Sequence, residues 1–393
     1  MVVINLPQIA EYNATPWELS LAERLKRFYA AKKIKKVAVM LYGIADTSTF
    51  RYRCYNVAQA LEKSTDWGAV YFFEKEYDIV QTLIKDADLL VLTRVKWRHS
   101  LANLIARAKA NNVPVLFDVD DRVFDLDALP ILTNTLAVDL SSEHALDFWF
   151  ADIARIQQAA SLAEGFLATN DYLGNKLHEK FSRPYQIIPN SLNDEQIRVS
   201  QRLSKEKRER KSIKPFTIGY FSGTPSHIND FLMVHKELLA FLISYPDTRL
   251  CVVGFMEFPQ EMQLLIDAGR IEFIPLVDFI ELQRLVAQVD VNIVPLINNS
   301  FTNCKSELKF FEAAVVDTIT LATPIYSYRH SIRNGETGFL CSTGQWYDTI
   351  ESIYLEKVDT NKMCDAAKED VLKRYYGPVF MKQIENAYNS FIR

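Results

Sequence analysis

The sequence predicts two Rossmann-like α/β domains, each built on a doubly wound parallel sheet, that face one another across a cleft. Three observations predict this fold class. The length of 393 residues suits two or three domains. Short apolar runs alternate with helical patterns, which is typical of βαβ units. The runs are continuously apolar, as expected for parallel strands that are covered on both faces.

The first domain is expected to span residues 1–200. Its strands are predicted at residues 37–42, 69–73, 89–93, 113–118, 165–169 and 186–188. Helical patterns fill the gaps between them, for example at residues 51–63, 99–111 and 143–163. Before the first strand, residues 21–36 form a basic amphipathic stretch, which fits either a solvated helix or a helix that contacts a membrane surface.

A dense group of cations at residues 202–214 divides the chain. Charge blocks are usually solvated, so we predict a charged linker at residues 201–214, with a nucleic-acid or lipid-headgroup patch as the alternative. The α/β pattern then restarts, and the second domain is expected at residues 215–365. Its strands are predicted at residues 216–220, 249–253, 271–273, 291–294, 320–322 and 325–326. A helical tail follows at residues 366–393, with a break at Gly377 and Pro378.

Composition narrows the class of protein. The chain is 49% hydrophobic with a net charge of -4, which excludes disorder as the main state and argues against wholesale binding of nucleic acid. No apolar run approaches the roughly 18 residues of a membrane-spanning helix, and the start shows no secretory pattern. Five scattered cysteines match neither a zinc site nor a disulfide framework. We therefore expect a reduced, cytoplasmic protein.

Ligands of open parallel sheets bind beyond the carboxyl ends of the strands, so the loops after strands are the first places to search for a site. The loop after residues 37–42 has one glycine where a dinucleotide fingerprint needs three. It leads to Arg51 and Arg53 near a helix start, where they can meet an anionic ligand or simply lie on the surface. We assign both arginines to acceptor binding.

A second loop carries three neighbouring carboxylates, Asp118, Asp120 and Asp121. Such a group is costly unless it binds a cation, accepts hydrogen bonds or shares a proton. Coordination of Mg²⁺ or Mn²⁺, catalytic contact with a sugar-like hydroxyl and ordinary turn chemistry all remain open. We assign the three aspartates to catalysis.

The second domain opens with a strand, a small polar turn and a helix at residues 218–230. Gly223 allows close approach of a ligand to the backbone, and Thr224 and His227 offer polar groups near a helix start. The turn is expected to bind an anion or, alternatively, only to cap the helix.

The most informative segment is residues 298–314, after the strand at residues 291–294. Asn303 or Thr302 is expected to cap a helix that begins near Lys305. Lysines in a first helical turn oppose the helix dipole unless an anion lies nearby, so Lys305 and Lys309 indicate an anion site. Glu312 lies within reach of a ribose diol, although Lys309 and Glu312 can also form a plain surface ion pair.

Taken in order, these motifs resemble GT-B glycosyltransferases of the family 4 type that act in bacterial polysaccharide assembly. The second-domain motifs that carry the resemblance read IGYFSGTPSHINDF, VDVNIVPLINNSFTNCKSELKFFEAA and NGETGFLC. Those of the first domain read FDVDDRVFD, FLATNDYL and IIPNSLN. The resemblance covers most of the chain.

The resemblance implies a donor site for a nucleotide sugar. The second glutamate of the family motif matches Glu312, which would bind ribose, whereas the first falls on Cys304, so Glu307 is the candidate substitute. The family's arginine and lysine against the diphosphate are absent from residues 223–230. Lys305 and Lys309 would take that role, with Ser306 beside them. The loops after Val253 and Ile274 would hold the base.

The resemblance further implies a retaining reaction without a metal or a cofactor, with the three aspartates on the acceptor side. The tail at residues 366–393 would return to the first domain. We expect a hexosyl- or deoxyhexosyltransferase that uses a glycan or lipid-linked acceptor for cell-surface polysaccharide, in the cytoplasm or at the inner face of the membrane. The main alternative is a non-catalytic nucleotide-sugar or glycan-binding protein, which Cys304 favours. A sugar epimerase and a nucleic-acid binder rank below it.

Overall fold

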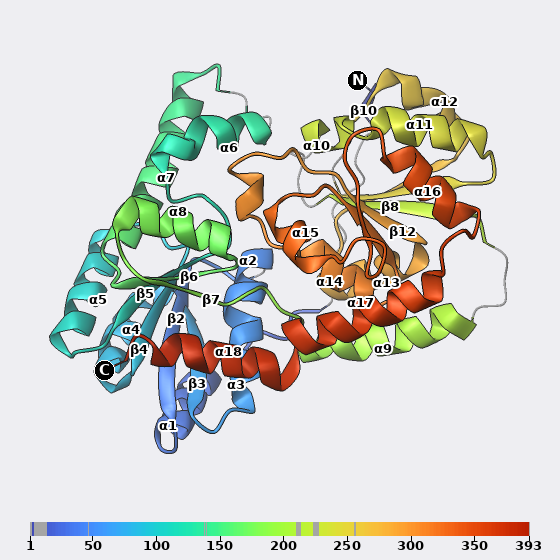
Figure 1. The fold of residues 1–393 in the computed structure, drawn as a ribbon. Coiled ribbons are helices and arrows are strands. Elements are labelled where there is room, and N and C mark those ends of the chain that lie inside the picture. The colour runs from blue at the N-terminus through green and yellow to red at the C-terminus, as the bar shows by residue number, and fades with distance from the viewer. Residues whose placement is uncertain are drawn as a thin grey trace.

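The computed structural model describes residues 14–45, 47–136, 138, 140–209, 214–222, 228–254 and 257–392, together with the backbone of residues 2–3. The chain forms two α/β domains side by side, each with a six-stranded sheet whose strands all run parallel (Figure 1). The predicted fold class is confirmed. Residues Val2–Val3 (β1) pair antiparallel with Glu257–Phe258 (β10) of the second domain.

The two sheets differ in strand order. The first runs β3 (Trp67–Phe73), β2 (Lys36–Tyr42), β4 (Leu89–Thr93), β5 (Val115–Val119), β6 (Gly165–Ala168), β7 (Tyr185–Ile187). The second runs β11 (Ile271–Ile274), β9 (Arg249–Gly254), β8 (Thr217–Ser222), β12 (Val291–Val294), β13 (Ile319–Ala322), β14 (Phe339–Leu340). The chain therefore reverses direction across the sheet beside β2 in one domain and beside β8 in the other, and these switch points are where ligands of such sheets bind.

Helices cover both faces of the first sheet, as continuous apolar strands require. They are α1 (Leu21–Lys32), α2 (Ser48–Phe50), α3 (Asn56–Glu62), α4 (Tyr77–Leu83), α5 (His99–Ala110), α6 (Leu129–Thr135), α7 (Glu143–Ser161) and α8 (Asp171–Phe181). A π-helix, η1 (Arg51–Tyr55), joins α2 to α3 without a break. Short 3₁₀ turns lie at Glu74–Glu76, Ile84–Asp86 and Leu126–Ala128.

The second sheet is covered in the same way. Its helices are α10 (Ile228–Leu232), α11 (His235–Ser244), α12 (Gln263–Asp267), α13 (Phe279–Gln288), α14 (Leu308–Ala314), α15 (Tyr326–Ser331) and α16 (Trp346–Tyr354). Single 3₁₀ turns lie at Gln260–Met262 and Thr302–Cys304. The expected strand at residues 325–326 is wrong, because this segment begins α15, and β14 was not predicted because it contains only two residues.

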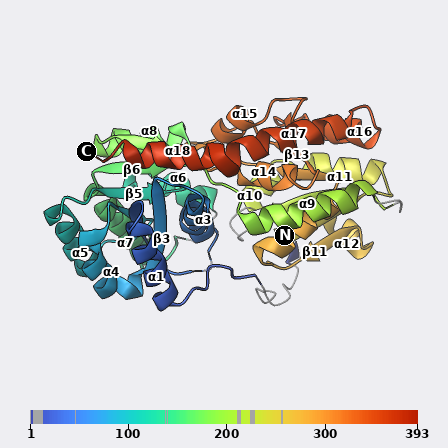
Figure 2. The ribbon, with the colours of Figure 1, turned by 90° about the horizontal axis from the view of Figure 1, so that it is seen from below.

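Two segments connect the domains. The chain enters the second domain through α9 (Asp194–Glu209), and it returns through α17 (Thr360–Tyr375) and α18 (Gly377–Asn389), which run end to end across both domains (Figure 2). The turn between them is at Gly377, with φ of 74°. Beyond it, Glu385 accepts a hydrogen bond from Ser64 at 2.6 Å and Asn389 accepts one from Trp67 at 3.0 Å, so α18 lies on the first domain.

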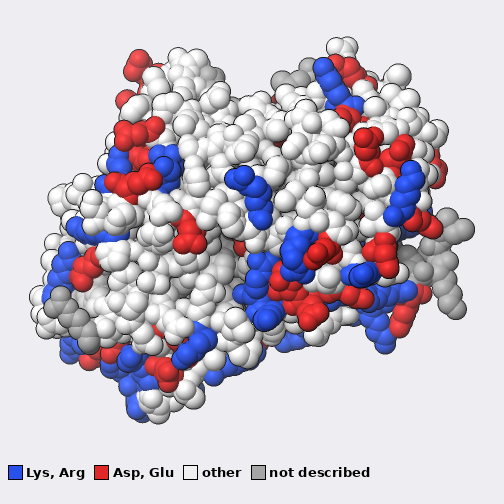
Figure 3. Space-filling view, in the orientation of Figure 1, with Lys and Arg blue, Asp and Glu red and all other residues white. Residues whose placement is uncertain are grey.

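The charged segment is not a solvated linker as far as Glu209. Residues 201–209 belong to α9, and residues 210–213 lie outside the described residues. The helix buries Ile197, Ser200 and Ser204 at helical spacing beneath its exposed charges. Its cations face acidic side chains of the second domain, with Arg208 2.8 Å from Asp317, and acidic and basic residues alternate over this surface (Figure 3). The many charged residues of this segment gave no sign, from composition alone, that one face of the helix is buried.

Apolar side chains also join the domains. Phe301 and Cys304 of the second domain are buried in the core on one face of the first sheet. Tyr52 and Leu192 of the first domain are buried in a core of the second. No helix among the described ranges is long and apolar enough to cross a membrane.

Candidate active site

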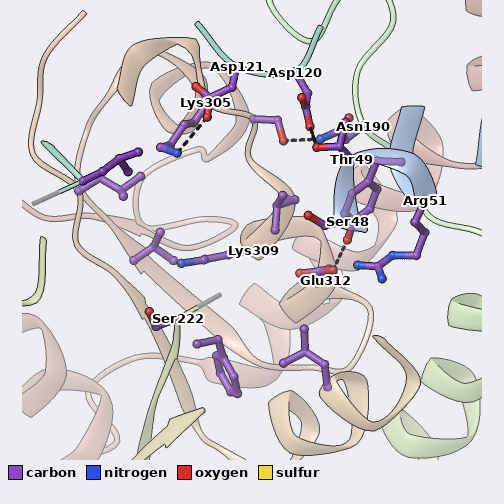
Figure 4. A pocket seen from close by; sticks show the side chains of 18 of the residues that line it. Ser48, Thr49, Arg51, Asp120, Asp121, Asn190, Ser222, Lys305, Lys309 and Glu312 are labelled. Carbon is purple, nitrogen blue, oxygen red and sulfur yellow. Dashed lines mark hydrogen bonds and ion pairs between the residues drawn. The ribbon is translucent and has the colours of Figure 1, made fainter. Parts of the chain in front are cut away.

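A cavity of about 470 Å³ lies between the domains, where the carboxyl ends of the two sheets face each other. The first domain lines it with α2, η1 and the loops after β4, β5 and β7. The second domain lines it with the ends of β8, β9 and β12, the loop after β11, and α14. Figure 4 shows polar side chains from both domains that converge on this space. The predicted cleft is thus a real cavity at both switch points.

The second-domain wall centres on α14. This helix begins at Leu308, so the expected start near Lys305 is wrong. Lys305 has extended backbone, with φ of -70° and ψ of 151°. Asn303 does not cap a helix there, because its side-chain oxygen accepts a hydrogen bond from the Tyr326 amide at 2.6 Å. Lys309 is therefore the lysine that lies in the first helical turn.

Lys309 is a half-buried cation in the cavity wall. Its ammonium lies 5.8 Å from the centre of the Tyr220 ring, and among the described residues it makes no hydrogen bond and no ion pair. Burial lowers the pKa of Lys309 to about 8, against an opposing effect of Asp230. A half-buried ammonium without a direct counter-ion attracts an anion, because the solvent on its open side screens it only in part.

Glu312 lies one helical turn beyond Lys309 and faces the same cavity (Figure 4). It is 4% exposed, and burial raises the pKa of its carboxyl group, while Tyr52, Arg51 and Lys309 oppose this effect. The Tyr52 hydroxyl donates a hydrogen bond to Glu312 from the first domain. The site thus holds a carboxylate and an ammonium that share one helix face.

The first-domain wall carries Asp120 and Asp121. Asp120 accepts hydrogen bonds from Thr49 at 2.9 Å and from Arg94 at 3.2 Å. Asp121 lies 3.3 Å from the Lys305 ammonium, across the interface between the domains. Both carboxylates therefore line the cavity with a cation or hydroxyl already beside them. The described residues contain no group of three or more side chains arranged to hold a metal ion.

Asp118 and Arg53 do not line the cavity, which corrects their expected roles. Arg53 is fully buried and donates to Asp118 at 2.6 Å and to the Ile188 carbonyl at 2.5 Å. Burial raises the pKa of Asp118 to about 6, although Arg53 opposes this effect. The pair ties η1 to β5 inside the first domain. A structural role explains both residues.

Other predicted residues have mixed outcomes. Arg51 lines the cavity, with its guanidinium 4.8 Å from the centre of the Phe279 ring and directed toward Glu312 (Figure 4). Glu307 does not line it, because its carboxylate accepts a hydrogen bond from Tyr375 at 2.6 Å, on the α17 side. Ser306 lines it and accepts a hydrogen bond from Asn190 at 2.9 Å.

The remaining predictions for the donor side, Gly223, Thr224 and His227, lie outside the described residues. The strand before them ends at Ser222, which lines the cavity. The loop of Leu276 and Val277 after β11 lines it too, and so does Val253 at the end of β9. These side chains give the cavity an apolar wall, and its use for a base stays a prediction.

Sequence reasoning missed Tyr52, Arg94 and Asn190, all of which line the cavity. Arg94 comes directly after the strand at Leu89–Thr93, so the rule about strand ends was enough to find it. Asn190 follows β7 by three residues and carried the same signal. No sequence signal pointed to Tyr52, because the direction of its side chain depends on the π-helix, and the sequence pattern does not predict a π-helix.

Comparisons with known proteins agree with this arrangement. Residues 216–355, the second domain, match the family model described as "Glycosyl transferases group 1". No curated protein matches the chain in sequence.

Solved structures match almost the whole chain. Anabaena Alr3699/HepE in complex with UDP and glucose has a TM-score of 0.61 and 13% identity, covering 90% of this chain and 99% of that one. A glycosyltransferase from Rickettsia africae has a TM-score of 0.61 and 14% identity, covering 91% and 98%. Sucrose-phosphate synthase from Thermosynechococcus elongatus has a TM-score of 0.57 and 13% identity, covering 90% and 98%. At these identities the likeness establishes the GT-B fold, and the resemblance predicted from the motifs is confirmed.

Proposed function

We propose that the protein is a glycosyltransferase that moves a sugar from a nucleoside-diphosphate sugar to an acceptor hydroxyl. The observation that carries the proposal is the pair Lys309 and Glu312, one helical turn apart at the wall of the interdomain cavity, with Glu312 buried and Lys309 half-buried. An ammonium at the cavity wall suits a diphosphate, and a carboxylate one turn away suits the ribose hydroxyls. The group 1 family model over residues 216–355 supports the same function.

The chemistry follows from charge. When the bond between the sugar and the phosphate breaks, positive charge develops on the anomeric carbon and negative charge on the departing diphosphate. Lys309, with Lys305 at the cavity wall, stabilises the departing charge in a space with little water. We propose that these two cations replace a divalent metal, that no cofactor takes part, and that the sugar keeps its anomeric configuration.

The acceptor side is assigned to the first domain. Asp120 and Asp121 lie across the cavity from Lys309 and accept hydrogen bonds, so they can orient an acceptor hydroxyl and receive its proton. Arg51 lies beside Glu312 and is assigned to the contact between donor and acceptor (Figure 4).

Uridine diphosphate sugars are the first donors to test, because one structure of similar fold was solved with UDP-glucose and another with UDP and GlcNAc. A hexose or deoxyhexose is the proposed sugar, and a glycan or lipid-linked chain of cell-surface polysaccharide is the proposed acceptor.

All five cysteines are free and buried, which suits a reducing cytoplasm. The exposed basic face of α1 is the proposed contact with the inner face of the membrane.

Calorimetry with UDP-, GDP-, dTDP- and CMP-linked sugars, with Mg²⁺ or with EDTA, tests this function. We expect one nucleotide class to bind equally in both conditions, and Glu312→Ala to weaken its binding by at least tenfold. Glu336→Ala is the matched control, because Glu336 is an exposed glutamate of the same domain that pairs with Arg333. If wild type binds none of these donors, the glycosyltransferase proposal is wrong.

A non-catalytic binding protein is the second candidate, and the observation in its favour is Cys304. This residue stands where the family motif has its first glutamate, and it is fully buried with its thiol 3.3 Å from the Ser300 carbonyl. Release of nucleoside diphosphate from a donor that binds separates the two functions. Turnover supports the transferase, whereas binding without turnover of any acceptor tested supports the binding protein.

A further inference from the structure

Three consecutive residues of η1 point in three directions. Arg51 lines the cavity, Tyr52 crosses to the second domain, and Arg53 enters the core of the first domain. The π-helical turn spans Arg51–Tyr55, and such turns are frequent at functional sites. Since Arg53 is locked by Asp118, the placement of Tyr52 is fixed by the first domain.

Tyr52 is built into the second domain although it belongs to the first. It is 1% exposed and belongs to the apolar core that contains α14. Its ring centre lies 6.0 Å from that of Phe311, the residue next to Glu312. Burial raises the pKa of the Tyr52 phenol, so the hydroxyl keeps its proton and acts as a donor.

The Tyr52 hydroxyl donates to Oε1 of Glu312, and no other hydrogen bond to this carboxylate is found within the described part of the chain. The Glu312 backbone is held separately, since its carbonyl accepts a hydrogen bond from Gln283 at 2.8 Å. The helix is therefore fixed by its own domain, whereas the carboxylate is oriented by the other domain. Oε2 remains for a ligand in the cavity.

We propose that Tyr52 is a positioning residue of the ribose subsite, which makes recognition of a ribonucleotide by the second domain depend on docking of the first. The inference rests on the proposed function, in which Glu312 binds the ribose diol. A glutamate side chain has several rotamers, so a carboxylate that is already held in one rotamer loses less conformational entropy when it binds a diol. Selection for ribose is therefore a property of both domains together.

The test compares a ribonucleotide with its analogue that lacks both ribose hydroxyls. Calorimetry first identifies which of UDP, GDP, ADP and CDP wild type binds, and then measures that nucleotide against its 2′,3′-dideoxy form. We expect wild type to prefer the ribonucleotide by tenfold or more, the scale of a hydrogen bond to a charged group. Tyr52→Phe, which removes one oxygen, should lose most of this preference, and Glu312→Gln should lose it as well.

Tyr55→Phe is the matched control. Tyr55 ends the same π-helix and donates a partly buried hydrogen bond to Glu195 at 3.0 Å, but it does not line the cavity. Tyr52→Phe and Tyr55→Phe therefore each remove one tyrosine–glutamate hydrogen bond, but only the bond of Tyr52 lies at the cavity. Tyr55→Phe should keep the preference for the ribonucleotide.

Three results would overturn the inference. The first is an unchanged preference in Tyr52→Phe, and the second is tighter binding of the ribonucleotide, which would mean that Tyr52 competes with ribose. The third is a wild type that binds no nucleotide of the four, which would sink the proposed function as well. If Tyr52→Phe does not fold, Phe311→Leu loosens the Tyr52 ring and leaves its hydroxyl in place; it should reduce the preference about threefold, and no reduction counts against the inference.

Discussion

The two domains share an architecture but use charge in opposite ways near the carboxyl ends of their sheets. In the first domain the charges pair at short range, with Arg53 2.6 Å from Asp118 and Arg94 3.2 Å from Asp120. In the second, burial shifts the pKa values of Lys309 and Glu312, and within the described part of the chain no ion pair is formed by Lys309. Paired charges hold loops in place, whereas the unpaired charge of Lys309 is available to a ligand. On the proposed function, the Arg53–Asp118 pair is therefore part of the scaffold and Lys309 is part of the binding surface.

The largest effect should come from breaking the scaffold. We expect Arg53→Met to lower the free energy of unfolding by about 3–5 kcal/mol, because it leaves the Asp118 carboxylate buried and uncompensated. Urea denaturation measures the change. Arg27→Met is the control, since the Arg27–Glu62 pair is exposed and should cost less than about 1 kcal/mol. Equal losses in both variants would show that the paired charges of the first domain do not stabilise it.

The next effect concerns turnover. Lys309→Met should lower kcat by about 10²–10³-fold, the scale of a lost charge-stabilising group, while folding is retained. Lys305→Met should lower it less, because Lys305 already pairs with Asp121. Initial rates of nucleoside-diphosphate release decide between them. If Lys305→Met lowers kcat more than Lys309→Met does, then the absence of an ion pair does not identify the lysine that stabilises the departing diphosphate.

This contrast also explains how far the sequence could lead. Strand positions were predictable because continuous apolar runs must be buried on both faces, and 89–93 and 291–294 match β4 and β12 at both ends. Lys309 was singled out because a lysine in a first helical turn opposes the helix dipole, and Glu312 because it matches the second glutamate of the family motif. The partners of charged residues were not predictable: the sequence shows Asp118 beside Asp120, but only the fold shows that Arg53 neutralises one and Arg94 the other. The buried stripe of α9 was hidden for the same reason, under charges that pair with the second domain.

The pH dependence of donor binding sharpens the comparison. The pKa of Lys309 is about 8, so its charge is present below pH 8 and is lost above it. Affinity for a nucleoside diphosphate should therefore fall above pH 8, by up to about tenfold per pH unit. Calorimetry between pH 7 and pH 9.5 measures this slope. A wild-type slope that persists in Lys309→Met would assign the titration to another group.

Stability should change in the opposite direction over the same range. The pKa of Lys309 is about 8 in the folded protein against the ordinary lysine value of 10.5, so between these values the unfolded chain binds more protons. Unfolding free energy therefore rises with pH from about 8 to 10.5 on account of this residue. Lys207 has a pKa lowered to about 8 by burial as well, and it contributes with the same sign. Because Lys207 is present in both proteins, the difference between wild type and Lys309→Met isolates Lys309.

The smallest effect belongs to the turn that carries the chain back from one domain to the other. Gly377 has φ of 74°, and a Cβ there would meet no atom within 4 Å, so alanine is opposed by backbone strain alone. We expect Gly377→Ala to cost about 1 kcal/mol in urea denaturation. Gly43→Ala is the control, because a Cβ at Gly43 also meets nothing within 4 Å and Gly43 has no positive φ, so its effect should stay within about 0.5 kcal/mol. Donor affinity should be unchanged in both variants. If Gly377→Ala weakens donor binding more than tenfold, the turn between α17 and α18 also sets how the two domains dock, and the carboxyl ends of the two sheets cannot be treated as independent.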